Sequence, residues 1–337
     1  MMRFAKLLIK EDFEIYTSFK IGGKIAKVYF PETVEEFAQI LKDESNIFVG
    51  GNWSNTLLSS HGYSGSVIST SKLDKIEEQR AGGQEGKLVN ESSLSELPQS
   101  PQPDTVLSPY RPIALSPNII TVASGVKGPK LAQTVAEYSL SGLEFMIGFP
   151  GSVGGEVFMN AGAHGQSVSD VLKSAKVYDG EKIITLTKDE MEFSYRHSIC
   201  QDKKYIVLEA EFELTPENPD KIKQKMAENL EFRKAHQPSL ALPNCGSIFR
   251  NPENNSAGKL LDECGVKGLQ IGGAKVWENH ANFIVNTGNA TSTDVLKLML
   301  EMKQRVKEKF GIELIPEIKF LGDNEDEVRL CEKLKIK

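Results

Sequence analysis

The hydrophobic positions near the start of the chain switch between the strand period and the helix period. Ile25 to Phe30 predicts a strand. Thr33, with Glu36 three residues later, is the capping-box pattern of a helix start. The apolar positions of that helix share one face: Val34, Phe37, Ala38 and Leu41. A strand followed so closely by a helix is typical of proteins that mix α and β structure.

A short apolar stretch, Asn46 to Val49, runs directly into the pair Gly50-Gly51. Ser66 to Ser69 predicts the next strand along the chain. A strand that ends in a glycine loop is a place where α/β proteins commonly bind phosphate groups. The loop at Gly50 is therefore the first candidate for a cofactor site.

The strand pattern resumes at Asn118 to Ala123. Pro129 is well placed to open a helix, because its missing N–H has no helical partner at that position. The apolar side of this predicted helix is formed by Leu131, Val135 and Tyr138. Two further strands, Ser174 to Tyr178 and Lys182 to Thr187, flank the turn Asp179-Gly180.

Tyr205 to Leu214 alternates strictly between apolar and acidic residues. The apolar positions are Ile206, Leu208, Ala210, Phe212 and Leu214, and the acidic ones are Glu209, Glu211 and Glu213. This pattern predicts a half-buried strand with one face in water. We therefore interpret the glutamates as the solvated side of a strand rather than as an acid site.

The remainder of the chain predicts mostly helices. Residues 215–219 resemble a linker, and helices are expected at about 220–236, 256–264 and 292–310. Strands are expected at 281–286 and 312–318. The predicted fold class is α+β, with a two-lobed nucleotide-binding domain followed by a smaller α+β domain. The predicted boundaries are 1–20 for an N-terminal segment, 21–215 and 216–324 for the two domains, and 325–337 for a tail.

Residues 77–117 differ from the rest of the chain. They carry six prolines among many Ser, Gln and Gly residues, and Tyr110 is their only aromatic residue. Such a composition buries too little apolar surface to offset the entropy of ordering. We interpret this segment as a surface insertion between two strands. The Pro98-x-x-Pro101 spacing could bind an SH3-like domain, but a solvated loop explains it more simply.

Composition narrows the function classes. The 337 residues have a net charge of −6 and a pI near 5.6, which argues against a general nucleic-acid binder. No stretch approaches the roughly 20 apolar residues of a membrane span, and the first ten residues do not resemble a signal peptide. We therefore expect a cytoplasmic monomer that acts on a small molecule, with no nucleic acid and no membrane insertion.

The four cysteines, Cys200, Cys245, Cys264 and Cys331, form no C-x-x-C pair, and the five histidines are scattered. A metal site is therefore not expected. Cys264 fits the buried face of a helix. A catalytic thiol at Cys245 is an alternative, although no nearby base supports it.

Two glycine-rich loops could hold a dinucleotide pyrophosphate, since glycines allow close approach and positive φ. The structural alternative is that both are tight turns and nothing more. No G-x-G-x-x-G follows a strand, and Gly86-Lys87 lacks the rest of a P-loop. The candidate cofactor residues are Gly50, Gly51, Asn52, Trp53, Ser54 and Asn55 in the first loop, and Gly148, Pro150, Gly151, Ser152, Gly154, Gly155, Asn160, Ala161 and Gly162 in and after the second.

Five segments in one order are more specific than any one alone. They are Gly50–Asn55, Gly148–Gly155, Tyr195–Ser198, Asn244–Pro252 and Ile315–Ile318. Together they resemble the UDP-N-acetylenolpyruvoylglucosamine reductase family, over about residues 17–322. The segments 17–23, 272–276 and 280–286 are also similar to that family. Two residues depart from its pattern: Trp53 stands where a glycine is usual, and His164 where an aromatic such as tyrosine is usual.

The resemblance implies a flavoprotein of the vanillyl-alcohol-oxidase (PCMH) type, with FAD as cofactor and NADPH as co-substrate. It implies reduction of the enolpyruvyl group of a UDP-sugar in peptidoglycan synthesis. This reaction needs a hydride donor, a cation beside the carboxylate and a positioned proton donor. By resemblance, Arg196 is the cation, Ser247 the proton donor and Glu317 the assisting carboxylate.

The same resemblance suggests polar residues for the substrate diphosphate: Tyr195, Arg250, Asn251, Lys259 and Lys275. Each of these side chains is equally well explained as solvated surface. Two other functions compete with the reductase. One is a flavin-dependent alcohol oxidase of the same superfamily, and the other is a catalytically inactive FAD or UDP-sugar binding protein. Neither requires Arg196, Ser247 and Glu317 together.

Overall fold

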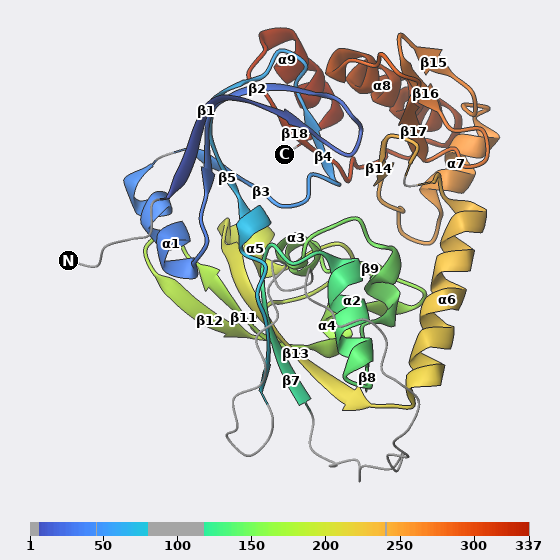
Figure 1. The fold of residues 1–337 in the computed structure, drawn as a ribbon. Helices are drawn as coiled ribbons and strands as arrows, with labels where there is room; N and C mark the ends of the chain where they lie inside the picture. Colours follow the sequence, from blue (N-terminus) through green and yellow to red (C-terminus); the bar gives the residue numbers. More distant parts are fainter. Residues whose placement is uncertain (1–6, 45, 80–117, 240, 337) are drawn as a thin grey trace, which may run out of the picture. The chain divides into compact units, whose positions relative to one another are not determined.

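The computed structural model describes residues 7–44, 46–79, 118–239 and 241–336. The chain forms two compact units: the first combines residues 1–72 with 230–337, and the second is 73–229. In Figure 1 the first unit carries the blue and the orange-to-red elements, and the second is largely green and yellow. These units group the residues differently from the predicted domains, because strands from the two ends of the chain pair with each other.

The first unit contains a four-stranded sheet of order β1-β2-β5-β3. β1 pairs antiparallel with β2, whereas β5 pairs parallel with both β2 and β3. The predicted strands at 25–30, 46–49 and 66–69 all lie in it. The elements of this part are β1 (Leu8–Tyr16), β2 (Gly22–Phe30), α1 (Val34–Asp43), β3 (Ile47–Gly50), β4 (Thr56–Leu58), β5 (Tyr63–Ser69) and the 3₁₀ turn η1 (Thr70–Lys72).

Helix α1 begins as predicted, with one difference in its cap. The Thr33 hydroxyl accepts a hydrogen bond from the Glu36 N–H at 3.1 Å. The Glu36 carboxylate, however, accepts from the N–H of Glu32 at 2.9 Å, one residue before the cap. The Glu36 N–H is therefore capped as predicted, but Thr33 and Glu36 do not form the reciprocal pair of a capping box.

The first unit also contains an antiparallel sheet of order β14-β17-β16-β15 and three helices over one hydrophobic core. β18 pairs parallel with β4, which joins the two ends of the chain. The elements are β14 (Asn244–Ser247), α7 (Ala257–Glu263), β15 (Gln270–Ile271), β16 (Ala274–Val276), β17 (Phe283–Asn286), α8 (Ser292–Phe310), β18 (Lys319–Leu321) and α9 (Glu325–Leu334).

The residues that we expected to form a tail include helix α9, which is anchored by a buried carboxylate. Glu327 has no exposed surface and accepts hydrogen bonds from the hydroxyls of Ser59 (2.6 Å), Thr293 (2.8 Å) and Ser292. Three hydroxyl donors offset the cost of removing this group from water. Cys331 and Leu334 of α9 add apolar contacts to the core.

The second unit is built on an antiparallel sheet of order β12-β11-β13-β7-β6, with β8 paired to β13. The predicted alternation of β13 is confirmed: Leu208, Ala210, Phe212 and Leu214 are buried. On the other face, Glu209 pairs with Lys176 at 2.6 Å and Glu211 lies 3.8 Å from Lys173. These glutamates therefore belong to the charged face of a strand.

Short helices and turns accompany this sheet, and α6 (Pro219–His236) continues from residue 229 into the first unit. The elements are β6 (Ile76–Gln79), β7 (Asn118–Ala123), α2 (Gly128–Glu137), β8 (Leu140–Ser141), η3 (Glu144–Gly148), α3 (Val153–Phe158), β9 (Gly162–Ala163), β10 (Gln166–Ser167), α4 (Val168–Val171), β11 (Leu172–Tyr178), β12 (Ile183–Thr187), α5 (Ile199–Lys203) and β13 (Ile206–Pro216).

One predicted strand is wrong. Residues 312–318 form an extended segment with a single bridge, Phe249 to Pro316, and the strand β18 begins only at Lys319. Two backbone bonds flank this bridge, from the Arg250 N–H to Ile315 and from the Glu317 N–H to Ile248, and within the described residues the pairing does not extend to residues 312–314. The predicted insertion at 77–117 begins too early, because residues 77–79 belong to β6 and pair with β7. The rest of the predicted solvated loop, residues 80–117, lies outside the described residues.

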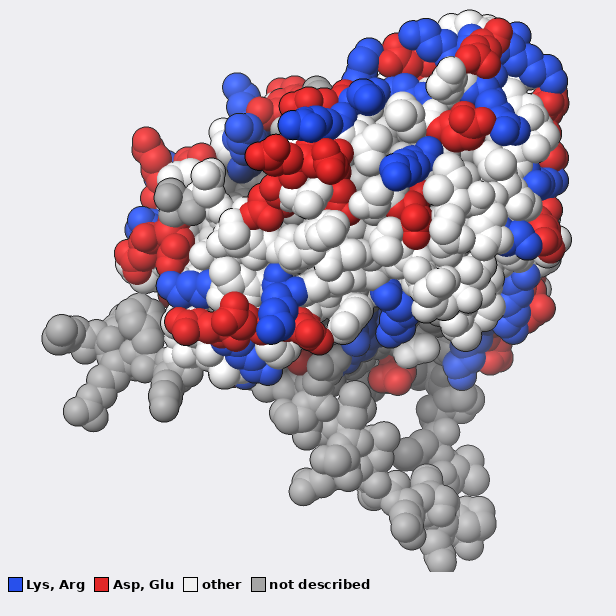
Figure 2. All heavy atoms as spheres, turned by 90° about the horizontal axis from the view of Figure 1, so that it is seen from above, with Lys and Arg blue, Asp and Glu red and all other residues white. Residues whose placement is uncertain are grey.

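Charged side chains of both signs are interspersed on the face drawn in Figure 2. The first unit carries exposed pairs such as Lys267–Asp262 at 2.7 Å and Arg305–Glu301 at 2.8 Å. Within the described ranges, no helix is long and apolar enough to cross a membrane. The same residues contain no cluster of three or more His, Cys, Asp or Glu side chains that could hold a metal ion.

Candidate active site

The predicted proton donor Ser247 is half-buried at the end of β14. β14 pairs with β17 at Asn244–Val285 and at Ser247–Phe283, with a register shift between the two pairs. Within this irregularity, Gly246 has φ +81° and donates its N–H to the Asn244 side-chain oxygen at 3.0 Å. Apart from its two chain neighbours, no described residue has an atom within 4 Å of a Cβ built on Gly246, so conformation rather than space requires glycine there. The irregularity therefore sets the direction in which Ser247 points.

Glu317 is held beside the strand that continues from Ser247. Its N–H donates to the Ile248 carbonyl at 2.8 Å, and the Arg250 N–H donates to the Ile315 carbonyl at 2.9 Å. Phe249 and Pro316 face each other between these two bonds. The structure thus places two of the predicted catalytic residues, Ser247 and Glu317, on hydrogen-bonded neighbouring segments.

Cys245 lies two residues before Ser247 and is 4% exposed. Burial, and secondarily the charge of Glu317, raise the pKa of its thiol well above the ordinary value. A thiol that stays protonated is a poor nucleophile. The burial of Cys245 and the raised pKa of its thiol therefore argue against the alternative of a catalytic thiol there.

The first glycine loop is held by side chains. Trp53 has φ +56°, and its ring lies against Gly50, where an added Cβ would come within 2.3 Å of the indole. The same ring stacks on Phe48 with 6.0 Å between centroids. At the end of the loop, the Asn55 side-chain amide donates to the Glu317 carbonyl at 3.1 Å, and the Asn55 carbonyl accepts from the Lys319 N–H at 2.9 Å. This loop is therefore tied directly to the Glu317 segment.

The second glycine loop is held by its backbone, in the second unit. It forms a short ladder with residues 124–128, through Gly128 N–H to Gly151 (3.2 Å), Val153 N–H to Val126 (2.8 Å) and Gly154 N–H to Ser124 (2.8 Å). A Cβ on Gly154 would lie 2.8 Å from the Cβ of Ser124. Glycine is required at 154 because the two backbones approach so closely.

This loop leaves polar groups that suit an anionic, polar cofactor such as FAD. Within the described part of the chain, the N–H groups of Gly151, Ser152 and Gly155 have no hydrogen-bond acceptor. The Ser124 hydroxyl and both carboxyl oxygens of Glu156 are buried and likewise have no partner there. Converging backbone N–H groups are the usual means of binding a pyrophosphate. The residues of this loop therefore fit the group that the sequence predicts.

Glu156 was not identified as a site residue from the sequence. It lies on α3, is 4% exposed, and its carboxyl fills the space in front of Gly128 and Gly151. Burial raises the pKa of Glu156 to about 8, so the carboxyl is largely neutral at pH 7. The only signal in the sequence is an acidic residue directly after a run of glycines.

Arg196 lies on a tight turn that adjoins the second loop. Ser194 and His197 exchange both backbone hydrogen bonds at 3.1 Å, and Arg196 between them has φ +55°. The Arg196 guanidinium donates to the Gly162 carbonyl at 2.9 Å, and Asn160 donates to the Ser194 carbonyl at 3.0 Å. A left-handed arginine persists only where its surroundings hold it, as they do at many functional sites. The predicted catalytic Arg196 and the predicted cofactor residues Asn160 to Gly162 are thus brought together.

His164, which departs from the family pattern, occupies the two-residue turn of the hairpin β9–β10. His164 and Gly165 have φ values of +55° and +77°. Positive φ at both central residues is typical of the tight hairpin turns that favour glycine and asparagine. Burial lowers the pKa of His164, which favours the neutral ring.

The predicted substrate residues differ in their surroundings. Tyr195 is 54% exposed and packs its ring against Arg196, with 5.1 Å between the guanidinium carbon and the ring centre. Asn251 accepts from the Ala257 N–H at 3.0 Å at the start of α7. Lys259 is largely exposed and Lys275 pairs with Glu278 at 2.5 Å. Arg250 is half-buried next to Phe249. Asn251 and Lys275 thus have local structural roles in addition to any role with a substrate.

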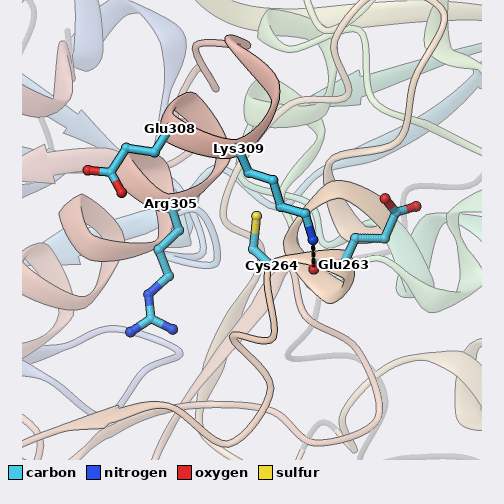
Figure 3. A pocket seen from close by; sticks show the side chains of 5 residues that line it. All are labelled: Glu263, Cys264, Arg305, Glu308 and Lys309. Carbon is cyan, nitrogen blue, oxygen red and sulfur yellow. Dashed lines mark hydrogen bonds between the residues drawn. The ribbon is translucent and has the colours of Figure 1, made fainter.

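A surface hollow of about 340 Å³ lies between α7 and α8. Figure 3 shows its lining residues, Glu263 and Cys264 from the end of α7 and Arg305, Glu308 and Lys309 from α8. Lys309 donates to the Glu263 carbonyl, and burial raises the pKa of the half-exposed Cys264. None of the predicted site residues lines this hollow, and its thiol is not activated.

Comparisons with known proteins agree with the family resemblance. A family model described as the UDP-N-acetylenolpyruvoylglucosamine reductase C-terminal domain matches residues 237–321. The reductase of that name from Caldanaerobacter subterraneus is 37% identical over 328 residues, which are 96% of this chain and 96% of that relative. The reductase from Bacillus subtilis is 36% identical over 326 residues, or 95% of each protein.

Among solved structures, the UDP-N-acetylenolpyruvylglucosamine reductase from Thermus caldophilus matches with a TM-score of 0.70 at 29% identity, covering 94% of this chain and 99% of that one. The predicted α+β fold class is therefore confirmed, and the chain shares its fold with this reductase. The chain belongs to the UDP-N-acetylenolpyruvoylglucosamine reductase family and is an oxidoreductase.

Proposed function

We propose that this protein reduces the enolpyruvyl group of UDP-N-acetylglucosamine enolpyruvate to give UDP-N-acetylmuramate, a precursor of peptidoglycan. FAD is the cofactor and NADPH the co-substrate in this proposal. The main support is the family membership over 96% of the chain. The placement of Glu317 on the segment that is hydrogen-bonded to the residue after Ser247 agrees with it.

The residues proposed to hold FAD are those of the two glycine loops and the segment Asn160 to Gly162. In the second loop, the N–H groups of Gly151, Ser152 and Gly155 would donate to its phosphate oxygens. The bound cofactor would accept a hydride from NADPH and supply one to the substrate. The Gly50–Asn55 loop would contribute its glycine backbone, while Asn55 also holds the Glu317 segment.

The chain's own residues supply the rest of the chemistry. Negative charge that develops toward the substrate carboxylate needs a fixed cation, and Arg196 offers a planar, always-charged group. The carbon next to that carboxylate must then receive a proton, which the Ser247 hydroxyl would donate. Glu317 would polarise this step and assist in restoring the hydroxyl. Tyr195, Arg250, Asn251, Lys259 and Lys275 remain the proposed contacts of the UDP diphosphate.

Ser247→Ala tests the central assignment. It should leave flavin reduction by NADPH nearly unchanged and slow the reaction of the reduced enzyme with the enolpyruvyl UDP-sugar by about 10²–10⁴-fold. The two steps are measured separately by anaerobic stopped-flow absorbance. Ser256→Ala, which removes the cap of α7, is the control and should affect stability but neither step. Equal slowing of both steps by Ser247→Ala would show that Ser247 is structural.

A further inference from the structure

Asn282 is a buried asparagine whose side chain makes two hydrogen bonds to a single residue, Phe249, just after the strand β14. It is 3% exposed and directly precedes β17. Its side-chain oxygen accepts from the Phe249 N–H at 3.0 Å, and its side-chain amide donates to the Phe249 carbonyl at 2.8 Å. Its own carbonyl accepts from the Ile248 N–H at 2.9 Å. Three hydrogen bonds from Asn282 therefore fix the two residues after Ser247.

The other edge of the same strand is held by the Glu317 segment. Ile248 accepts from the Glu317 N–H at 2.8 Å, and Arg250 donates to Ile315 at 2.9 Å. In an antiparallel pair, the N–H and carbonyl of Phe249 then point away from Pro316, toward Asn282. β17 begins only at Phe283, so the Asn282 carboxamide takes the place of the missing strand residue. Without it, two buried peptide groups of Phe249 would be left unpaired, at a cost of about 1–3 kcal/mol each.

Ser247 depends on this support more than an ordinary strand residue would. The register of β14 shifts between Asn244 and Ser247, and Gly246 lies in the left-handed region. Because the ladder is irregular before Ser247, the position of this serine is determined mainly by Ile248 and Phe249. The backbone of these two residues follows directly after β14 and is hydrogen-bonded to Asn282 on one side and, through Ile248, to Glu317 on the other.

We propose that Asn282 is the positioning residue of the reductase site, holding Ser247 and Glu317 in register through the backbone of Ile248 and Phe249. The inference rests on the proposed roles of Ser247 and Glu317. Asn282 itself would contact neither the substrate nor the cofactor. Its own N–H donates to the Nδ1 atom of His280 at 3.2 Å, which fixes the loop that carries it. Burial lowers the pKa of His280 and so keeps this ring nitrogen available as an acceptor.

The test compares two asparagines at either end of one short stretch. Asn282→Asp keeps the acceptor for the Phe249 N–H but replaces the donor to the Phe249 carbonyl. Asn286→Asp is the matched control: Asn286 lies on β17, is 6% exposed, and binds the Phe19 carbonyl at 2.9 Å and the N–H groups of Gly288 and Ala290 at 2.8 and 3.0 Å. Both variants should melt at lower temperature than the parent protein.

Only Asn282→Asp should slow the reaction of the NADPH-reduced enzyme with the enolpyruvyl UDP-sugar, by about 10²-fold, because misplacement by about 1 Å has effects of that size. Flavin reduction by NADPH should stay close to the parent rate in both variants. If Asn282→Asp fails to fold, Asn282→Ser, which keeps a smaller polar group, carries the same comparison and should show a weaker effect in the same step.

A double-mutant cycle separates positioning from general damage. In the Ser247→Ala background, Asn282→Asp should have little further effect on the second step, because the group that it positions is already absent. If the double variant were slowed by the product of the factors measured for the two single variants, the inference would be overturned. The inference would also be overturned if Asn282→Asp and Asn286→Asp had the same rate in the second step while Ser247→Ala was slow in it. In that case the proposed function would still stand. A Ser247→Ala protein with a normal second step would instead refute the proposed proton donor.

Discussion

The two glycine loops share a sequence signal but are built in different ways. Gly50 to Asn55 is stabilised by side chains, since the Trp53 ring covers Gly50 and Asn55 binds the Glu317 carbonyl. The loop from Gly148 to Gly155 is stabilised by a backbone ladder, and several of its N–H groups have no acceptor within the described residues. Glycine is thus needed at Gly50 because the Trp53 ring occupies the space of a Cβ, and at Gly154 because two backbones approach closely.

This difference predicts a division of labour. The second loop is proposed to donate its N–H groups to the cofactor, and among the described residues it has an unpaired carboxyl buried beside it. Its perturbation should therefore alter stability and cofactor binding. The first loop leads into β4 and is fastened to the segment of Glu317, so its perturbation should reach the chemical step. Substitutions in and beside each loop can test this division.

The largest stability effect is expected at Glu156. Its pKa is raised from 4.5 to about 8 in the folded protein, so the native state keeps a proton that the unfolded chain has lost. Stability due to this group is therefore greatest below about pH 4.5 and declines as the pH rises toward 8. Glu156→Gln carries no charge and should be more stable than the parent, by on the order of a few kcal/mol at pH 8 and by little at pH 5.

Urea unfolding at pH 5, 7 and 9 measures this difference. Glu144→Gln is the control, because the buried Glu144 carboxylate accepts from Ser141 at 2.6 Å and from the Gly142 N–H at 3.0 Å. That variant should lose stability, since it breaks satisfied hydrogen bonds. A Glu156→Gln protein whose stability tracks the parent at every pH would show that Glu156 has a partner in solution.

A smaller effect on stability is expected when a methyl group is added between the second loop and residue 124. Gly154→Ala places a methyl group 2.8 Å from the Ser124 Cβ, whereas the nearest atom to a Cβ on Gly155 is 3.9 Å away. Overpacking of this kind costs about 1–3 kcal/mol. Gly154→Ala should therefore melt lower and purify with less FAD, while Gly155→Ala should resemble the parent in melting temperature. Equal FAD content and melting temperature in the two variants would contradict the backbone account of this loop.

In the first loop, the informative change is Asn55→Ala. Loss of one hydrogen bond to the Glu317 carbonyl should cost about 1 kcal/mol of stability, and a similar loss in the transition state corresponds to roughly fivefold slowing of the second half-reaction. FAD content should stay close to that of the parent. Asn324→Ala, which removes a bond of 3.2 Å to the Glu327 N–H, is the control for stability alone. Loss of FAD with a normal second step would assign Asn55 to the cofactor instead.

The smallest effect on activity is expected from the segment between the two loops in the sequence. β6 and β7 are antiparallel neighbours, and Gln79 pairs with Ile119 at their ends. A short Gly-Ser turn in place of residues 80–117 can therefore join them. Turnover and FAD content should be unchanged, and shortening the connection should raise stability by about 0.6 kcal/mol per halving of its length. A marked rise in KM for the UDP-sugar alone would instead give this segment a part in substrate capture.

Local patterns predicted much of the fold. The apolar stripe of α1 and the alternation of β13 survive in the structure because burial of one face explains both. β1 was not predicted, since its residues are mostly exposed and four of the nine are charged, as is common in edge strands. The error at 312–318 came from relying on hydrophobic spacing alone, because this segment pairs with its neighbour only at the Phe249–Pro316 bridge and the two bonds beside it. The contribution of α9 depends on Ser59, far away in sequence, and so no local pattern could reveal it.

The residues of the candidate site likewise fall into those that the sequence could identify and those that only tertiary contacts reveal. Ser247, Arg196 and Glu317 could be named because short motifs around them resemble a family, and the irregular ladder of β14 accounts locally for the direction of Ser247. Asn282 and Glu156 could not be named, because their significance lies in tertiary contacts: one pairs with Phe249, and the other is buried without a partner among the described residues. Whether a polar residue is satisfied is a property of the fold rather than of its neighbours in sequence.

The central claim is that one chain carries out both half-reactions of an enolpyruvyl reductase. The direct test uses the unaltered protein under anaerobic conditions, followed by its flavin absorbance. Addition of NADPH should bleach the yellow colour, and addition of UDP-N-acetylglucosamine enolpyruvate should then restore it, with formation of one UDP-N-acetylmuramate per flavin. Bleaching that only oxygen reverses, or a protein that shows no flavin absorbance at all, would contradict the account.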